Sequence, residues 1–245
     1  MIEGFLAASP RFLLRLLPVL LGLVMSHPAF AQENEKNPDP WEGMNRKVQK
    51  FNDGADRYVL RPLAVGYTKV VPRFMRRGVS NFFNNLTYPV VVVNQFLQGK
   101  WRDGFADTGR FLVNSTLGIG GLFDPASRAG LDAHEEDFGQ TFAKWGVASG
   151  PYLVVPFRGP ATIRDGGGAI VDSAMFPPRY SDDVPLRNSL TGLYFLDQRA
   201  ALLDVDQLVS GDRYTFMRDA YLQRREFLIL DGEVEDSFMD EEWED

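Results

Sequence analysis

Residues 72–99 read PRFMRRGVSNFFNNLTYPVVVVNQFLQG, and this stretch shows how the chain is organised. Its apolar side chains first recur at steps of four, three and four residues, at Met75, Val79, Phe82 and Leu86. That spacing puts them on one face of a helix, which Pro72 can begin. We expect Pro89 to break this helix. The valine run 90–93 alone could form a strand, but its continuation through Asn94, Phe96 and Leu97 favours a buried helix.

The same organisation extends to both sides of this stretch. Asp39 can cap a helix that Pro40 begins, and Glu42 completes the capping spacing. One apolar face follows, formed by Met44, Val48, Phe51, Ala55 and Tyr58. Pro62 and Pro72 end one helix and can begin the next, while two-residue alternation is scarce. The sequence therefore predicts an all-α, compact single domain of short helices punctuated by Pro and Gly, with breaks too frequent for a long-helix bundle.

The composition excludes several classes of chemistry. The chain has 245 residues, a net charge of −7, 44% apolar residues and no cysteine. An apolar content this high is typical of a folded protein rather than a disordered chain. The absence of cysteine from the sequence excludes disulfides, cysteine nucleophiles, Cys-ligated zinc and a lipid attached to cysteine.

Residues 1–31 are predicted to be a secretory signal peptide. Arg11 and Arg15 supply positive charge, residues 16–25 are apolar, and Ala29-Phe30-Ala31 forms an A-x-A cleavage site. The alternative is a membrane anchor, but the apolar run is short and interrupted. We therefore expect an exported protein, cleaved after Ala31, with a helical domain over 32–230.

The last fifteen residues, 231–245, include nine acidic residues and no basic one. Such a run is typical of a solvated, disordered tail, and the alternative is a docking role.

Residue types that carry catalysis are scarce. Beyond the predicted signal peptide the sequence has one histidine, His134, which is followed by acidic residues as on a protein surface. The sequence has no G-x-S-x-G elbow, P-loop, dinucleotide fingerprint or EF-hand loop. We therefore predict no enzyme activity, no cofactor and no metal site. The acidic net charge and the predicted export argue against nucleic acid as a partner.

A basic cluster precedes the first apolar face of residues 72–99. The basic residues are Lys69, Arg73, Arg76 and Arg77, and the aromatic residues Phe74, Phe82 and Phe83 lie beside them. Cations next to aromatic side chains suit the phosphates of lipids. The alternative is a solvated helix face whose arginines keep their charges in water.

Residues 150–178 differ from the rest. Two apolar limbs, 150–157 and 169–176, flank a polar and glycine-rich turn. One interpretation is a core segment followed by a surface loop. The other is an amphipathic hairpin that lies against lipid or along a path for lipid.

Many short motifs occur together in one order: Asp39-Pro40, Glu42-Gly43, Asn45-Arg46, Arg61-Pro62, Val71-Pro72, Asn81-Phe82, Asn85-Leu86, Phe96-Leu97-Gln98-Gly99, Gly150-Pro151-Tyr152, Pro156-Phe157, Arg164-Asp165, Leu203-Asp204 and Gln223-Arg224. In this order and spacing they resemble the MlaA (VacJ) family, which maintains lipid asymmetry in the outer membrane of Gram-negative bacteria. The resemblance spans about residues 38–227.

The resemblance implies a helical ring in the inner leaflet of the outer membrane, with an amphipathic central channel and a helical hairpin at 150–178. Mislocalised phospholipid would leave the outer leaflet through this channel and pass to a periplasmic lipid carrier (MlaC-like), without ATP at this step. The implied partners are phospholipid, that carrier and a trimeric porin.

Composition and resemblance together suggest roles within 150–178. The apolar wall for acyl chains is assigned to Tyr152, Val154, Val155 and Phe157, and the polar contacts to Arg164, Asp165 and Asp172. Gly166, Gly167 and Gly168 are the predicted hinge of the hairpin. The competing function is a structural or assembly protein that docks on a porin without moving lipid, and a lipid hydrolase that uses His134 is a third.

One departure from the family pattern concerns anchoring. Family members typically carry a lipobox cysteine, which this sequence lacks. The resemblance then implies attachment through the folded body, a porin or both.

Overall fold

The computed structural model describes residues 38–207, 209 and 211–233. The predicted signal peptide and nearly all of the predicted acidic tail lie outside these residues. The described elements, in chain order, are α2 (Glu42–Ala55), the π-helical turn η3 (Asp56–Leu60), α3 (Arg61–Val70), α4 (Arg73–Leu97), α5 (Trp101–Thr116), α6 (Pro125–Arg128), α7 (Phe138–Lys144), β1 (Tyr152–Val155), β2 (Gly159–Thr162), α8 (Ile163–Ala174), η4 (Pro177–Tyr180), α9 (Val184–Ala201), η5 (Val205–Gln207) and α10 (Arg213–Ile229). The predicted, mostly helical single domain is confirmed.

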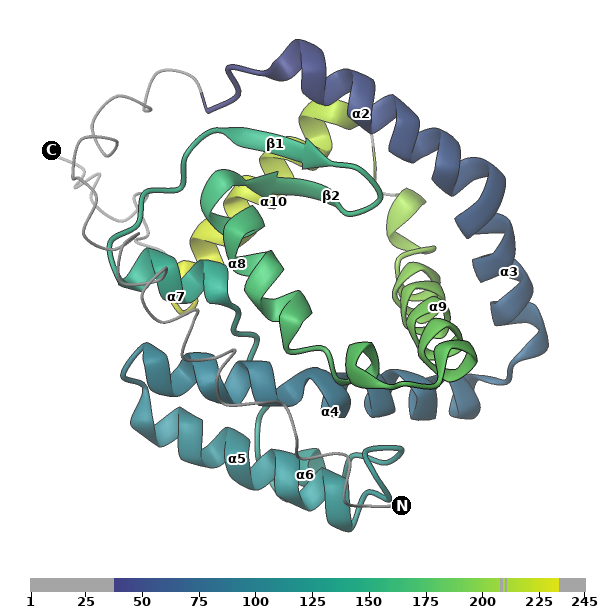
Figure 1. Ribbon diagram of the computed structural model, residues 1–245, viewed down its shortest axis with the longest axis vertical. Coiled ribbons are helices and arrows are strands. Elements are labelled where there is room, and N and C mark those ends of the chain that lie inside the picture. The colour runs from purple at the N-terminus through teal and green to yellow at the C-terminus, as the bar shows by residue number, and fades with distance from the viewer. Residues whose placement is uncertain (1–37, 208, 210, 234–245) are drawn as a thin grey trace, which may run out of the picture.

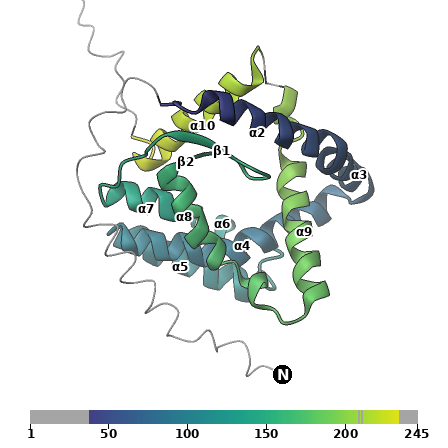
Figure 2. The same cartoon turned by 45° about the horizontal axis from the view of Figure 1, so that its top comes forward.

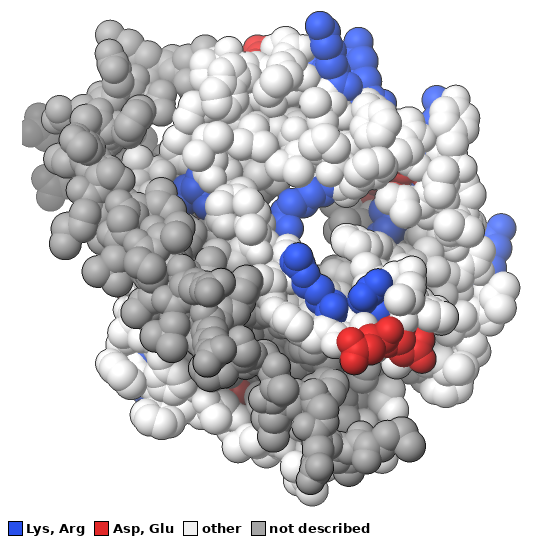
Figure 3. Space-filling view, in the orientation of Figure 1, with Lys and Arg blue, Asp and Glu red and all other residues white. Residues whose placement is uncertain are grey.

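The elements follow one another in a closed circuit around a common centre (Figures 1 and 2). Helices α2 and α3 follow one another along one side, with α9 beside α3 on its inner face; α4 runs along the bottom of the view, and α8 with the β1–β2 hairpin returns to α2. We call this set the ring. Helices α5 and α6 lie outside it against α4, and α10 lies behind the hairpin. Figure 3 shows that the surface is hollowed at the centre, with Lys and Arg side chains at the edge of the hollow.

Helix α4 corrects the prediction of a break at Pro89. The helix runs without interruption from Arg73 to Leu97 with Pro89 inside it, so the valine run 90–93 is helical as predicted. Proline removes one backbone hydrogen bond, but packing against neighbouring helices keeps the residues on both sides of it helical. Buried Tyr88 donates to Asp107 of α5 at 2.6 Å, and buried Asn94 accepts from Thr141 of α7 at 2.5 Å.

Residues 150–178 correct the prediction of a helical hairpin. The first limb forms the antiparallel pair β1–β2, in register from Tyr152 opposite Thr162 to Val155 opposite Gly159. The predicted glycine-rich turn is the interior of helix α8. The side chain of Thr162 caps that helix by accepting from the amide of Asp165 at 3.2 Å. The β-branched and aromatic limb 152–155 suits a strand better than a helix.

Polar side chains close the ring on the side of α2. The Nδ2 of buried Asn45 donates to the carbonyl of Tyr152 at 3.1 Å, and its Oδ1 accepts from the amide of Val154 at 2.9 Å. Tyr152 and Val154 pack in turn against Tyr214 of α10. One asparagine therefore joins α2 to the edge of β1, over the small apolar core that the hairpin shares with α10.

A second polar joint holds α3, α4 and α9 together. Buried Asp197 of α9 accepts from the hydroxyl of Tyr67 at 3.2 Å and from that of Ser80 at 2.8 Å. Nearby, Arg199 binds Asp56 of the π-helical turn through two nitrogens, at 2.5 and 2.9 Å. The ring is therefore held together by buried polar side chains as well as by apolar packing.

Candidate functional site

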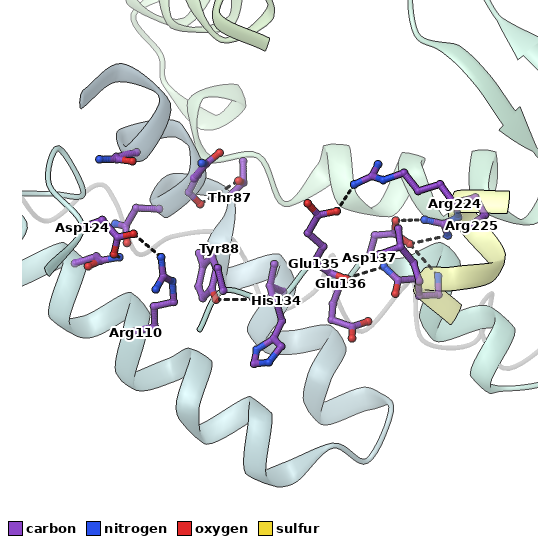
Figure 4. A pocket seen from close by; sticks show the side chains of 18 residues that line it. Thr87, Tyr88, Arg110, Asp124, His134, Glu135, Glu136, Asp137, Arg224 and Arg225 are labelled. Carbon is purple, nitrogen blue, oxygen red and sulfur yellow. Dashed lines mark hydrogen bonds and ion pairs between the residues drawn. The ribbon is translucent and has the colours of Figure 1, made fainter. Parts of the chain in front are cut away.

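Two adjoining hollows lie on the inner side of α10. The larger, about 390 Å³, is bounded by α4, α5, the segment 133–137 and α10. The smaller, about 190 Å³, lies between β2, α8 and α10; we call it the charged hollow, and its lining residues are Asp137, Arg158, Pro160, Ala161, Asp165, Asp172, Tyr221, Arg224 and Arg225. The two hollows share Asp137, Arg224 and Arg225. Figure 4 shows these three residues beside the larger hollow, with Arg224 paired to Glu135 and Arg225 to Asp137.

Arg225 is the centre of the ion pairs in the charged hollow. Its Nη1 lies 2.5 Å from Asp137 Oδ2, and its Nη2 lies 3.0 Å from Asp165 Oδ1. Arg164 Nε also approaches Asp165 Oδ1, at 3.1 Å, and the Tyr221 hydroxyl donates to Oδ2 at 2.8 Å. Burial alone would raise the pKa of Asp165, but the charges of Arg225 and Arg164 outweigh it and lower the pKa. Asp165 is therefore an ionised, fully engaged carboxylate that joins α8 to α10.

Asp172 lines the same hollow but has a different electrostatic environment from Asp165. Burial and the neighbouring charge of Asp137 raise its pKa to about 7. It accepts a hydrogen bond from the amide of Phe138 at 3.3 Å, and no described Lys or Arg nitrogen lies within 4.0 Å of it. Near neutral pH this carboxyl therefore exchanges between its neutral and charged forms.

A third hollow, about 260 Å³, lies at the tip of the β-hairpin; we call it the tip hollow. Its apolar side chains come from η3, the hairpin tip, the residue after α9, η5 and α10, and they include Leu60, Phe157, Leu202, Val205, Phe216 and Met217. Arg158 and Pro160 line both the tip hollow and the charged hollow. The lining of the tip hollow is mostly apolar but also includes Asp53, Asp56, Arg199, Asp206 and Arg213, and it adjoins the charged hollow at the tip of the hairpin.

The hairpin tip is held by α2. The amide of Phe157 donates to Asn52 Oδ1 at 2.8 Å, and Asn52 Nδ2 donates to the carbonyl of Val155 at 3.0 Å. Phe157 adopts the left-handed region at φ 62° and its ring meets that of Phe51 edge-on at 5.1 Å. A non-glycine residue in that region is uncommon, so the surrounding contacts must hold it there.

The predicted residues of 150–178 are divided among different environments. Tyr152 and Val154 are only 1% and 3% exposed, so they belong to the core and present no wall to a ligand. Val155 is half-buried, while Phe157 is 70% exposed and lines the tip hollow. Arg164 and Asp165 form a buried pair. Of the seven predicted contact residues, the structure brings only Asp165 and Asp172 into the charged hollow.

The three predicted hinge glycines lie within α8. A Cβ at Gly166 or Gly167 would meet open space, whereas a Cβ at Gly168 would lie 2.3 Å from the backbone nitrogen of Gly139 in α7. Gly168 therefore permits a close approach of two helices. The hinge itself stays a prediction.

The basic cluster lies at the start of α4, away from the hollows described above. Arg73 and Arg77 are exposed beside Phe74, and Arg76 is half-buried with its Nε 3.2 Å from the carbonyl of Val71. This placement fits either a solvated face or contact with lipid phosphates, as in the sequence analysis.

Sequence reasoning missed most residues of the charged hollow. Arg158 stands in the predicted polar turn but carries no motif, and Asp137, Tyr221 and Arg225 reach the site from other elements. Arg225 is 88 residues from Asp137 and 60 from Asp165 along the chain. No local pattern encodes pairings over such separations.

Other chemistry is limited in the described part of the chain. His134 Nδ1 lies 3.0 Å from Asp107, which also accepts from Tyr88 and Gln95. Within residues 38–207, 209 and 211–233, no group of three or more His, Cys, Asp or Glu could hold a metal ion. In the same residues, no helix combines the length and apolar character needed to cross a bilayer.

The chain is similar in sequence to proteins that are named MlaA. The family model described as MlaA lipoprotein matches residues 37–228. The Intermembrane phospholipid transport system lipoprotein MlaA of Escherichia coli (strain K12) is 38% identical over 229 residues, which cover 90% of this chain and 91% of the relative. The protein of the same name from Haemophilus influenzae is 35% identical over 213 residues, 84% of each chain.

A solved structure agrees with these matches. The structure described as "Structural basis for maintenance of bacterial outer membrane lipid asymmetry" superposes with a TM-score of 0.68 at 38% identity, and the match covers 78% of this chain and 98% of that one. The family model, the relatives and the shared fold together show that this chain belongs to the MlaA family.

Proposed function

We propose that this protein transports phospholipid, taking mislocalised molecules from the outer leaflet of the outer membrane through the ring and delivering them to a periplasmic lipid carrier. Relatives at 35% and 38% identity are named as components of an intermembrane phospholipid transport system. The observation that carries the proposal is the adjacency of the mostly apolar tip hollow and the charged hollow, which share Arg158 and Pro160.

The energetics of a phospholipid explain why both surfaces are needed. Each methylene moved from hydrocarbon to water costs about 0.8 kcal/mol, so two acyl chains with roughly 30 methylenes would cost on the order of 20 kcal/mol. The phosphate, in contrast, resists an apolar medium because an isolated buried charge is very costly. A route with an apolar side and a charged side satisfies both ends of the molecule, and transfer down a gradient then needs no ATP.

Attachment to the inner leaflet is proposed to come from the folded body. The relatives are named lipoproteins, whereas this sequence has no cysteine. Helix α5 and the loop after it expose a set of large apolar side chains: Trp101, Phe105, Leu112, Leu117, Ile119 and Phe123. An exposed apolar area of this kind is typical of a surface that contacts a membrane or a protein. A trimeric porin is the protein partner that we propose.

Phe157 offers a direct test of transport. Phe157→Asp places a carboxylate in the tip hollow, and Asp tolerates the left-handed conformation of this position. Phe157→Leu is the matched control because it keeps an apolar side chain there. In cells that lack the native copy, and at equal protein levels, we expect Phe157→Asp to leave phospholipid in the outer leaflet while Phe157→Leu removes it. Full clearance by Phe157→Asp would refute the proposed route.

The same variants separate transport from porin docking. If Phe157→Asp still copurifies with a porin but no longer moves labelled phospholipid to an acceptor, transport is the function. If Phe157→Asp instead loses both porin binding and the clearance of phospholipid from the outer leaflet, a structural or assembly role is favoured. Fatty-acid release by the purified protein, abolished by His134→Ala, would indicate a hydrolase.

Attachment is tested by fractionation. We expect the protein to stay with the outer membrane through a carbonate wash, and complete release into the soluble periplasm would contradict attachment through the folded body.

A further inference from the structure

Arg158 differs from the other arginines of the hollows. Arg110, Arg199, Arg213, Arg224 and Arg225 each pair with a carboxylate. Among the arginines that line the hollows described above, within the described residues, only Arg158 has no carboxylate oxygen within 4.0 Å. It is also exposed. Its guanidinium is therefore available to a ligand.

The position of Arg158 places this charge where the two proposed surfaces meet. Arg158 lines both the tip hollow and the charged hollow. Burial raises the pKa of Asp172 in α8 and of Tyr194 in α9, and the charge of Arg158 offsets part of both shifts. The guanidinium therefore lies within electrostatic range of two helices of the ring.

The backbone around Arg158 is fixed before any ligand arrives. The amide of Arg158 donates to the carbonyl of Val155 at 3.3 Å, and Asn52 holds the residues on either side of Pro156. Gly159, which follows, adopts φ +96°, a left-handed conformation that favours glycine. A side chain on a fixed turn loses less freedom on binding than one on a mobile loop.

The charge balance of the charged hollow leaves Arg158 and Asp172 unmatched. The two carboxylates of Asp137 and Asp165 are neutralised by Arg225 and Arg164, while Arg224 pairs with Glu135 outside this set. What remains is one cation and one carboxyl that exchanges between charged and neutral forms. The hollow is therefore neutral to singly positive.

On the basis of the proposed transport function, we propose that Arg158 binds the phosphate diester of the lipid headgroup and gives the passage a preference for anionic over zwitterionic phospholipids. A guanidinium presents parallel N–H donors that match two phosphate oxygens. An anionic headgroup adds no second cation, whereas an ammonium headgroup brings a positive charge close to Arg158. Asp172 opposes this preference when it is ionised.

Lipid binding by purified full-length protein in detergent tests the role of Arg158. The probes are fluorescent phosphatidylglycerol and phosphatidylethanolamine with identical acyl chains, and inorganic phosphate is the competitor. We expect Arg158→Gln to weaken phosphatidylglycerol binding about tenfold and to bring the preference ratio close to one. Arg158→Lys keeps the charge without the fork, so we expect about a threefold loss. Asp172→Asn should strengthen phosphatidylglycerol binding about twofold to threefold.

Controls make each outcome decisive. Arg128→Gln, on the exposed side of α6, should bind both lipids like the wild type, and all variants should show the wild-type circular dichroism spectrum. Wild-type binding by Arg158→Gln, an unchanged preference ratio, or an equal loss in Arg128→Gln would overturn the inference and leave transport standing. Displacement of lipid by inorganic phosphate at comparable concentration would overturn the headgroup as the ligand. A wild-type protein that binds neither lipid would instead refute the proposed transport function.

Discussion

The contact between α7 and α8 permits one sharp prediction from two adjacent glycines. Gly167 and Gly168 are both interior to α8, so alanine improves the helix propensity of each by about 1 kcal/mol. A Cβ at Gly167 would meet nothing within 4 Å, whereas a Cβ at Gly168 would lie 2.3 Å from the nitrogen and 2.8 Å from the Cα of Gly139. The two substitutions should therefore change stability in opposite directions.

The size of the effect follows from the geometry. The atoms that a Gly168 Cβ would meet belong to backbone, so they cannot rotate away, and α7 must move by about 1 Å to restore normal contact. Overpacking of this kind costs about 1–3 kcal/mol. Displacing α7 also disturbs Gly139, where a Cβ would lie 2.7 Å from both Asp165 and Arg225. Because Gly139 is also tightly packed, we take the upper end of this cost, about 3 kcal/mol; after the propensity gain of about 1 kcal/mol, Gly168→Ala should lose about 2 kcal/mol, whereas Gly167→Ala should gain about 0.5–1 kcal/mol.

Urea unfolding followed by tryptophan fluorescence and far-UV circular dichroism measures both free energies of unfolding, and the m-value should be unchanged. For a domain of this size, the loss in Gly168→Ala corresponds to a Tm lower by about 4–8 °C. Equal stability of Gly168→Ala and wild type, or shifts of the same sign in both variants, would refute the packing argument. Unaltered lipid transport by Gly167→Ala would count against the predicted hinge.

Three further predictions concern single side chains. Burial raises the pKa of Asp172 to about 7, so its contribution to stability is present below pH 4 and lost as pH rises through 7. A rise of the pKa by about 3 corresponds to roughly 4 kcal/mol, so Asp172→Asn should stabilise the protein by roughly that amount at pH 8.5 and hardly at pH 4 in urea unfolding, and a pH-independent difference would contradict this. Arg199→Lys should lose about 2 kcal/mol because lysine cannot replace the two-nitrogen contact with Asp56, while Arg61→Lys, which is exposed, should lose less than about 0.5 kcal/mol. Asn52→Ala should speed hydrogen exchange at the amide of Phe157, which donates to Asn52, without affecting exchange in α4. Unchanged exchange at Phe157 would show that the hairpin tip does not depend on α2.

Local sequence patterns predict the helical class because periodic apolar faces and proline or glycine boundaries are local properties. The face that contains Met75, Val79, Phe82 and Leu86 lies in α4 as expected. The predicted break at Pro89 is wrong because the side chains of Tyr88 and Asn94 form hydrogen bonds with α5 and α7, and these are tertiary contacts. The sequence carries no direct sign of them.

The candidate site is only partly predictable for a similar reason. Asp165 and Asp172 can be selected because they stand in one unusual segment, but the partner Arg225 enters from the far end of the chain. Tyr152 is misassigned because an apolar residue in a strand looks the same from the sequence whether it faces a core or a ligand. Exposure decides between the two, and exposure follows from how α10 packs behind the hairpin.

The bond between Asn45 and β1 also bears on the order in which the chain assembles. This asparagine meets strand residues 107 and 109 positions away, whereas α4 and α5 are neighbours in sequence and can pair early. Closing so long a segment has an entropic cost that local pairs avoid. We expect the contact between Asn45 and β1 to form last. Until it forms, the ring of a newly synthesised chain is not closed, and the residues on its inner side are briefly exposed and prone to aggregation.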